Sequence, residues 1–291
     1  MTYSVSSSSL RMIRRTVLAL ALSGLSCQAA FELEKTRPLA EKGDVQAQLE
    51  MGNAYLDGDG VGKSYTKAFT WYQKAAEQGS AKALNNLGVI YKNGYGVAAN
   101  PEEAVKYFRQ AAEKGLGGGQ YNLALSLEKG EGVKADPVEA LAWLQKAAAQ
   151  DVTQAQFKLA KFYFKGEGVP QDDVKGVQML IPVAEKGDLE AQVLLASHYE
   201  LGTGVKVDLK KAFLLYEKAA KHGDVEGQAN AGRMYFDGVG VKADRVKACM
   251  WLTLAARQGN VPSLKLAEAA TEKERAKGEQ LADEFTPVES K

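Results

Sequence analysis

The feature that most constrains this chain is a repeat of 36 residues, present six times without insertion or deletion. Two glycines and a valine recur in every copy. The first glycine column reads Gly58, Gly94, Gly130, Gly166, Gly202 and Gly238. The second column reads Gly60, Gly96, Gly132, Gly168, Gly204 and Gly240. A fixed period in this range is typical of stacked solenoids, which offer a partner a long surface and have no single deep catalytic core.

Each copy predicts two helices separated by a glycine loop. In the first copy, Ala47, Met51 and Tyr55 recur at helical spacing and form an apolar stripe over residues 45–56. Gly52, inside that stripe, predicts close approach of a neighbouring helix, because a helical glycine otherwise costs about 1 kcal/mol against alanine. The second helix starts at a column of good N-cap residues, which reads Ser64, Asn100, Asp136, Asp172, Asp208 and Asp244.

The second helix of each repeat ends at a glycine, with one exception. Asp151 replaces that glycine in the third copy, so we expect it to be the most strained helix end of the set. Residues 30–43 align with the close of a second helix and predict an N-terminal capping half-repeat before six repeats over 44–259. Residues 260–291 predict charged capping helices and a tail, with Thr271 and Glu274 placed as a capping box.

The motif of one whole repeat resembles the Sel1-like repeat family, which consists of tetratricopeptide-type helix pairs with a longer loop. The residues that carry the resemblance in the first copy are Ala47-Gln48, Met51-Gly52, Tyr55, Gly58, Gly60-Val61, Lys67-Ala68, Trp71-Tyr72, Lys74-Ala75-Ala76 and Gly79. The resemblance implies an all-α, right-handed α/α superhelical solenoid with a scaffold or adaptor role. Exported bacterial members of the family are generally partner-binding proteins.

The fourth repeat departs furthest from this motif. Gly176 replaces the alanine of the second helix, Met179-Leu180 replace the aromatic pair, and Pro182 lies inside the helical pattern. A proline in a helix interior costs about 3 kcal/mol. The sequence therefore predicts that the fourth repeat is the weakest internal stack.

The N-terminus predicts a cleavable signal peptide over residues 1–29, and hence a periplasmic or secreted bacterial protein. Arginines precede a short apolar run, and small residues surround cleavage after Ala29 or Ala30. The alternatives are a membrane anchor, for which the run is short, a lipoprotein at Cys27, or a true start at Met12. Loss of three arginines leaves 34 basic and 36 acidic residues, a net charge of −2, which gives no general attraction to nucleic acid or anionic membrane.

Residues that could carry chemistry are few. The two histidines, His198 and His222, have no second ligand at metal spacing, and we expect no metal and no cofactor. Ser64-x-x-Lys67 matches the nucleophile motif of penicillin-recognising enzymes, but Ser64 occupies the N-cap column and the accompanying motifs are missing. Cys249, the one cysteine left after cleavage, is expected to be buried apolar filler.

A partner-binding surface is the stronger prediction. Three positions of each first helix point away from its apolar stripe, and in a tetratricopeptide-type fold they line the concave groove. In order of repeat they read Glu50, Asn53, Asp57; Asn86, Val89, Asn93; Asn122, Leu125, Lys129; Lys158, Lys161, Lys165; Leu194, Ser197, Leu201; Asn230, Arg233, Asp237. The candidate binding residues are Asn86, Asn122, Lys158, Lys161, Phe162, Lys165, Asn230 and Arg233.

The sequence therefore predicts a non-catalytic periplasmic scaffold that binds a protein or peptide of the cell envelope. Three like charges at Lys158, Lys161 and Lys165 disfavour their own helix, so an acidic partner segment is the simplest reason for them. The alternatives are an envelope enzyme of the penicillin-binding or β-lactamase-like type, and a module that binds cell-wall polysaccharide. Exposed aromatic side chains would favour the last, but Trp71, Trp143 and Trp251 all lie in a core column.

Overall fold

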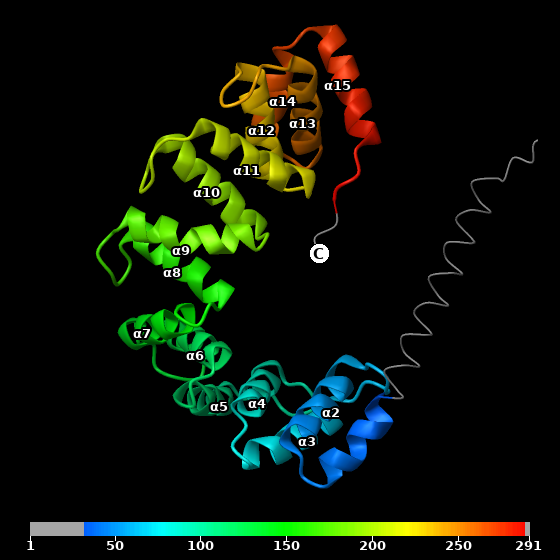
Figure 1. The fold of residues 1–291 in the computed structure, drawn as a ribbon, viewed down its shortest axis with the longest axis vertical. Helices are drawn as coiled ribbons and strands as arrows, with labels where there is room; N and C mark the ends of the chain where they lie inside the picture. Colours follow the sequence, from blue (N-terminus) through cyan, green and yellow to red (C-terminus); the bar gives the residue numbers. More distant parts are fainter. Residues whose placement is uncertain (1–31, 289–291) are drawn as a thin grey trace, which may run out of the picture. The chain divides into compact units, whose positions relative to one another are not determined.

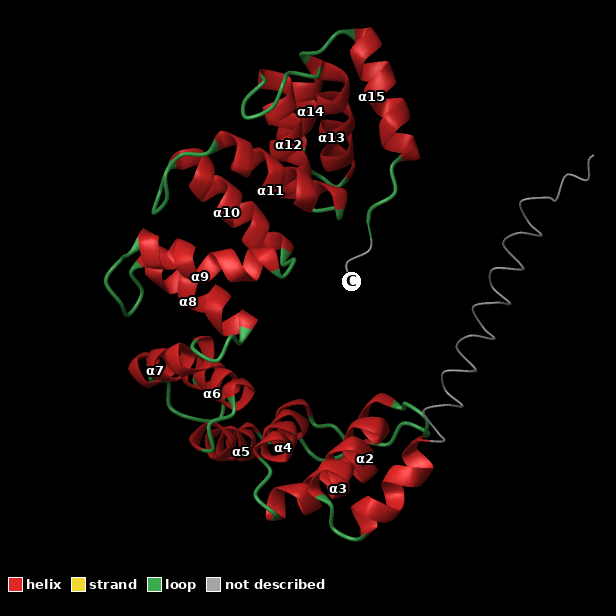
Figure 2. Cartoon of the chain, in the orientation of Figure 1, coloured by secondary structure: helices red, strands yellow, loops and turns green. Residues whose placement is uncertain are grey.

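The computed structural model describes residues 32–288, which form helices joined by loops and contain no strand (Figures 1 and 2). A first helix covers residues 32–41. The others are α2 (Val45–Asp57), α3 (Tyr65–Glu77), α4 (Ala81–Asn93), α5 (Pro101–Glu113), α6 (Gly117–Lys129), α7 (Pro137–Ala148), α8 (Thr153–Lys165), α9 (Asp173–Glu185), α10 (Leu189–Leu201), α11 (Leu209–Lys221), α12 (Val225–Asp237), α13 (Arg245–Arg257), α14 (Val261–Glu268) and α15 (Glu272–Glu284). The prediction of an all-α solenoid of helix pairs is confirmed for this part of the chain.

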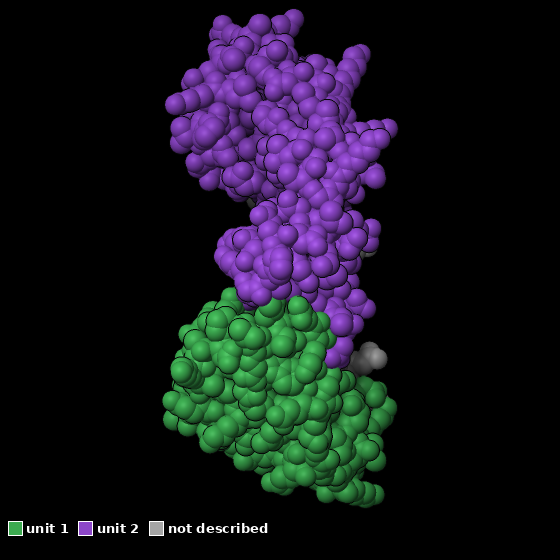
Figure 3. All heavy atoms as spheres, turned by 90° about the vertical axis from the view of Figure 1, so that its left-hand side faces the viewer, with its two compact units in different colours: residues 1–147 green, residues 148–291 purple. Residues whose placement is uncertain are grey.

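Contacts divide the chain into two compact units, with the boundary in the sequence between Ala147 and Ala148 (Figure 3). In the first unit each helix packs mainly against its neighbours in sequence, as α3 does against α2 and α4. The second unit repeats this pattern from α8 to α13, and α13 also packs against α14 and α15. Each helix therefore buries its apolar stripe only through its neighbours, as expected for a solenoid.

Both glycine columns are explained by the backbone. The first glycine of each loop ends the first helix in the left-handed conformation, for example at φ 75° in Gly202. The second glycine also has a positive φ, and at Gly96, Gly132, Gly204 and Gly240 it lies against the second helix of the preceding repeat. A Cβ added to Gly204 would lie 2.2 Å from the carbonyl oxygen of Asp173, and one on Gly132 would lie equally close to that of Pro101. Neither position has room for a side chain.

The close approach predicted at Gly52 is also present. A Cβ added there would lie 2.4 Å from Cε1 of Tyr72, whose ring is fully buried. The N-cap column is confirmed as well, since Asp172, Asp208 and others in it accept hydrogen bonds from the backbone three residues later. Asp151, at the exceptional helix end, has φ 58° and is the sole non-glycine residue with positive φ between residues 32 and 288.

A row of buried glutamines joins successive repeats, which the sequence analysis did not foresee. Each donates through Nε2 to the carbonyl oxygen of an alanine eight residues earlier, at the end of the preceding second helix. The bonds are Gln48 to Ala40, Gln120 to Ala112, Gln156 to Ala148, Gln192 to Ala184 and Gln228 to Ala220. The second repeat has Leu84 at this position and lacks the bond.

The C-terminal cap has the predicted character. Thr271 and Glu274 form a complete capping box at the start of α15. Cys249 is buried beneath this helix, and burial raises the pKa of its thiol. Pro182 lies inside α9 without ending it. The predicted signal peptide and its cleavage site lie outside the described residues, and no helix within 32–288 is long and apolar enough to cross a membrane.

Candidate functional site

One candidate site lies in the second unit, where residues of three successive first helices and one second helix line a pocket of about 670 Å³. Its floor is the outward face of α10, with Val193, Leu194 and Leu201 as apolar contacts and Ser197 between them. Val193, Ser197 and Leu201 follow one another at a spacing of four residues, and Leu194 lies three residues before Ser197, so the four side chains form one broad face of the helix. The volume is within the range of about 300–1,000 Å³ that is usual for ligand sites.

One wall of the pocket comes from the C-terminal half of α8, through Lys161, Phe164 and Lys165. The ring of Phe164 stacks on His198 with centroids 4.1 Å apart. A Cβ on Gly176 would lie 2.2 Å from Cε1 of Phe164, so the glycine that marks the fourth repeat leaves the space this ring needs. The departure of that repeat from its motif therefore shapes the pocket wall.

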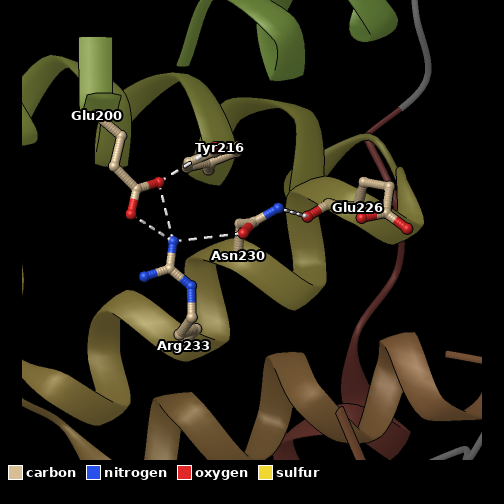
Figure 4. A network of polar contacts seen from close by, with 5 residues as sticks. All are labelled: Glu200, Tyr216, Glu226, Asn230 and Arg233. Atoms are coloured by element: carbon tan, nitrogen blue, oxygen red, sulfur yellow. Dashed lines mark hydrogen bonds and ion pairs between the residues drawn. The ribbon is translucent and has the colours of Figure 1, made fainter. Parts of the chain in front are cut away.

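Three other lining residues, Glu200, Tyr216 and Asn230, belong to a charge-compensated network with Arg233 (Figure 4). Arg233 Nη2 lies 2.8 Å and 2.9 Å from the two carboxylate oxygens of Glu200, and the Tyr216 hydroxyl donates to one of them at 3.4 Å. Asn230 Oδ1 accepts from Arg233 at 3.4 Å, and Asn230 Nδ2 donates to the Glu226 carbonyl. Burial, together with the Glu200 charge, raises the pKa of Tyr216 to about 12. Arg233, a predicted partner-binding residue, thus forms an ion pair with Glu200 of its own chain.

The lysine stripe of α8 is balanced by carboxylates of the same chain. Lys161 Nζ lies 2.6 Å from Glu190 Oε1, and Lys165 Nζ lies 3.5 Å from Glu167 Oε1. Lys158 lies over the partly buried ring of Phe162, 5.6 Å from its centroid. Lys161 therefore has a counter-ion of its own chain, Glu190. An acidic partner segment as the reason for the lysine stripe stays a prediction. Exposed pairs of this kind contribute about 0–1 kcal/mol, so a partner carboxylate can replace them at little cost.

Asn86 and Asn122, the two predicted residues of the first unit, belong to a separate and amide-rich site. Asn86 lines a pocket of about 380 Å³ with Asn53 and Asn85. Asn122 Nδ2 donates to Asn85 Oδ1 at 2.8 Å. The Tyr72 hydroxyl donates to Asn53 Oδ1 at 2.7 Å, and burial followed by the Asp57 charge raises the pKa of Tyr72 to about 12.

Three of the eight predicted residues, Lys161, Lys165 and Asn230, therefore line one pocket. Their function as partner contacts stays a prediction. The sequence analysis missed Glu190 and Glu200, because their partners lie about one repeat away and no motif marks them. Among residues 32–288 no three His, Cys, Asp or Glu side chains form a possible metal site.

The residues of the two alternative functions are engaged in structural contacts. Ser64 Oγ accepts from the Lys67 backbone N at 3.4 Å, as an N-cap does, while Lys67 Nζ lies over the Tyr55 ring. The ammonium group of Lys74 lies over the ring of Trp71, and that of Lys146 lies over the ring of Trp143. Trp251 is buried. Neither a serine–lysine pair nor an open row of indole rings is therefore present at these positions.

Stacked helix pairs joined by glycine loops, with pockets on the first helices, define a helical-repeat scaffold. A family model for the Sel1 repeat matches residues 45–80, 81–116, 118–152, 153–188, 189–224 and 225–260. The chain belongs to the Sel1 repeat family. Proteins with this repeat generally act as scaffolds for protein interactions, and the solenoid is typically non-catalytic.

Several solved structures resemble the chain, among them the following two. One is a protective antigen of uropathogenic Escherichia coli strains that displays an SLR fold, with a TM-score of 0.74 and 33% identity over 87% of this chain and 56% of the antigen. The chain thus spans little more than half of that protein. The other is a Sel1 repeat protein from Oxalobacter formigenes, with a TM-score of 0.66 and 29% identity over 84% of this chain and 98% of that one. No curated protein matches the chain in sequence.

Proposed function

We propose that the chain is an exported, periplasmic scaffold without catalytic activity of its own, and that it binds a protein or peptide of the cell envelope. The observation that carries this proposal is the pocket of about 670 Å³ built from α8, α10 and α12, the first helices of three successive repeats. An apolar floor with charged walls is the usual character of a site that binds through a few anchoring contacts. The signal-like pattern of residues 1–29 supports export.

The lysines of α8 give the site its charge preference. Lys158, Lys161 and Lys165 lie at i, i+3 and i+7 and share a face of the helix. A partner carboxylate can replace Glu190 or Glu167 as the counter-ion of Lys161 or Lys165. A site of this kind favours a partner with an acidic segment. Attraction between exposed charges acts mainly on the association rate and weakens with salt.

The test is capture of an envelope partner by the purified chain, compared with a Lys158→Glu, Lys161→Glu, Lys165→Glu triple variant. We expect the triple variant to lose capture at low salt while it keeps the helicity and melting temperature of the parent. The matched control changes the same number of exposed lysines of the second unit, as Lys206→Glu, Lys210→Glu and Lys218→Glu, and should keep capture. Equal capture by all three proteins would show that the binding surface lies elsewhere.

Export and the absence of catalysis have their own tests. N-terminal sequencing of the exported protein should give Ala30 or Phe31 as the first residue, and an intact N-terminus or a lipid on Cys27 would contradict the proposal. The purified chain should not hydrolyse nitrocefin. Hydrolysis that Ser64→Ala abolishes would instead favour the β-lactamase-like alternative.

A further inference from the structure

Helix α10 is unusual among the first helices because it is apolar on two faces. Ala191, Leu195 and Ala196 are buried where the helix packs against α9 and α11. The outward face carries Leu194 and Leu201, and Leu201 is 69% exposed. A helix that is apolar all round is normally covered on every side. On the outward face Leu194 is partly buried against the core of its own unit, whereas Leu201 is left exposed.

Comparison of the six repeats shows that this second apolar face is specific to the fifth. The residues at the position of Leu194 in the other first helices are Glu50, Asn86, Asn122, Lys158 and Asn230. The residues at the position of Leu201 are Asp57, Asn93, Lys129, Lys165 and Asp237. Every other repeat thus has a polar or charged side chain at both positions, so the repeat fold does not require leucine there.

The remaining side chains of the pocket specify the charge of what covers these leucines. Glu200 is held by Arg233, and Lys161 by Glu190, so these four charges compensate each other. Lys165 has only an exposed ion pair of 3.5 Å with Glu167, which lies in the following loop. Lys165 is therefore the charged lining residue that can most readily change its ion-pair partner, and this positive charge lies beside the apolar floor.

The length of the floor limits the size of the occupant. The lining residues of α10 run from Glu190 to Leu201, which at 1.5 Å per residue is about 17 Å. This length matches about three turns of helix or about five residues of extended chain. A short peptide segment fits this length, and a flat protein surface does not reach into such a pocket.

From these observations we infer that the pocket is a docking site for an acidic amphipathic segment of a partner protein. Two apolar side chains of that segment seat on Val193, Leu194 and Leu201, between Phe164 and Tyr216. A carboxylate of the segment, next to these two side chains, forms an ion pair with Lys165 in place of Glu167. This inference rests on the proposed scaffold function and names the part of the chain that recognises the partner.

The experiment uses the purified chain and a phage-displayed library of random peptides as the probe. We expect the enriched peptides to share two apolar side chains and at least one carboxylate. The most enriched peptide is then synthesised with a fluorescent label, and its dissociation constant is measured by anisotropy. Enrichment of basic or purely polar peptides, or no enrichment, would overturn the inference.

The variants use residues that the other repeats already tolerate. A Leu194→Asn, Leu201→Asp double variant carries the side chains of the sixth repeat, and we expect it to bind the labelled peptide at least about tenfold more weakly. Lys165→Glu should also weaken binding and reduce its salt dependence. Leu214→Asn is the control, because Leu214 is 52% exposed on α11 and does not line the pocket. An unchanged dissociation constant in the double variant would refute the assignment.

Two further results separate this inference from the proposed function. If the double variant still captures the envelope partner that the parent captures, the scaffold function stands and the docking site is wrong. If the parent forms a concentration-dependent dimer in sedimentation and the double variant does not, a second copy of the chain covers the leucines, and the peptide assignment is overturned.

Discussion

Gly204 offers a direct test of how the loops hold neighbouring repeats together. In a Gly204→Ala variant the new methyl group meets two obstacles. The backbone has φ 70°, where an L-residue costs about 1–2 kcal/mol. The Cβ would also lie 2.2 Å from the carbonyl oxygen of Asp173, and that oxygen belongs to the backbone of α9 and cannot rotate away. Overpacking of this kind adds about 1–3 kcal/mol.

Gly187 separates the two effects because it lies in the same unit with φ 100° and has no heavy atom within 4 Å of an added Cβ. Gly187→Ala should therefore cost only the backbone term. The two terms sum to about 2–5 kcal/mol for Gly204→Ala and to about 1–2 kcal/mol for Gly187→Ala. With about 2–4 °C lost per kcal/mol, the Gly204 variant should melt about 4–20 °C below the parent and the Gly187 variant about 2–8 °C below it. Thermal melts followed by circular dichroism measure both. Equal decreases would refute close packing as the reason for the second glycine column.

Two further predictions concern the buried tyrosines and the fourth repeat. Burial raises the pKa of Tyr72 and Tyr216 from 10.0 to about 12. The neutral phenols therefore stabilise the fold fully below pH 10, and this contribution is lost as the pH rises toward 12. The melting temperature should fall above pH 10, and it should fall less steeply in Tyr216→Phe. In α9, Pro182 donates no backbone hydrogen bond. Amide exchange measured by mass spectrometry should therefore be fastest in α9 among the internal second helices, and it should be slower in Pro182→Ala. Uniform protection of these helices would contradict a weak fourth repeat.

The sequence was sufficient for the fold because the determinants are local and repeated. A glycine that needs φ near 70°, an N-cap aspartate and an apolar stripe each act within one repeat, and six copies make each pattern unmistakable. The same reasoning placed Lys161, Lys165 and Asn230 on a surface that lines a pocket. It failed for the ion pairs, because Lys161 meets Glu190 only once α8 and α10 are packed side by side.

The fourth repeat also shows that contacts between two helices are hard to predict from a single sequence. The sequence analysis treats Gly176 and Pro182 only as residues that weaken an isolated helix. In the structure Gly176 also faces Phe164, so the missing side chain on α9 is matched by a ring from α8. Such a pair has no fixed spacing in a single sequence. It becomes visible only when two helices are placed against each other, which makes side-chain compensation harder to predict than helix boundaries.

The glutamine bonds between repeats bear on how a chain of this kind changes length. Each of the five junctions with such a bond is specified within nine residues, from an alanine at the end of one helix to a glutamine in the next, as from Ala184 to Gln192. The information for joining these repeats therefore travels with the segment that joins them. Duplication of a whole period that contains the bond carries a complete junction, whereas a partial period separates the glutamine from its alanine. We therefore expect a gene that encodes such a chain to change length in whole-repeat steps.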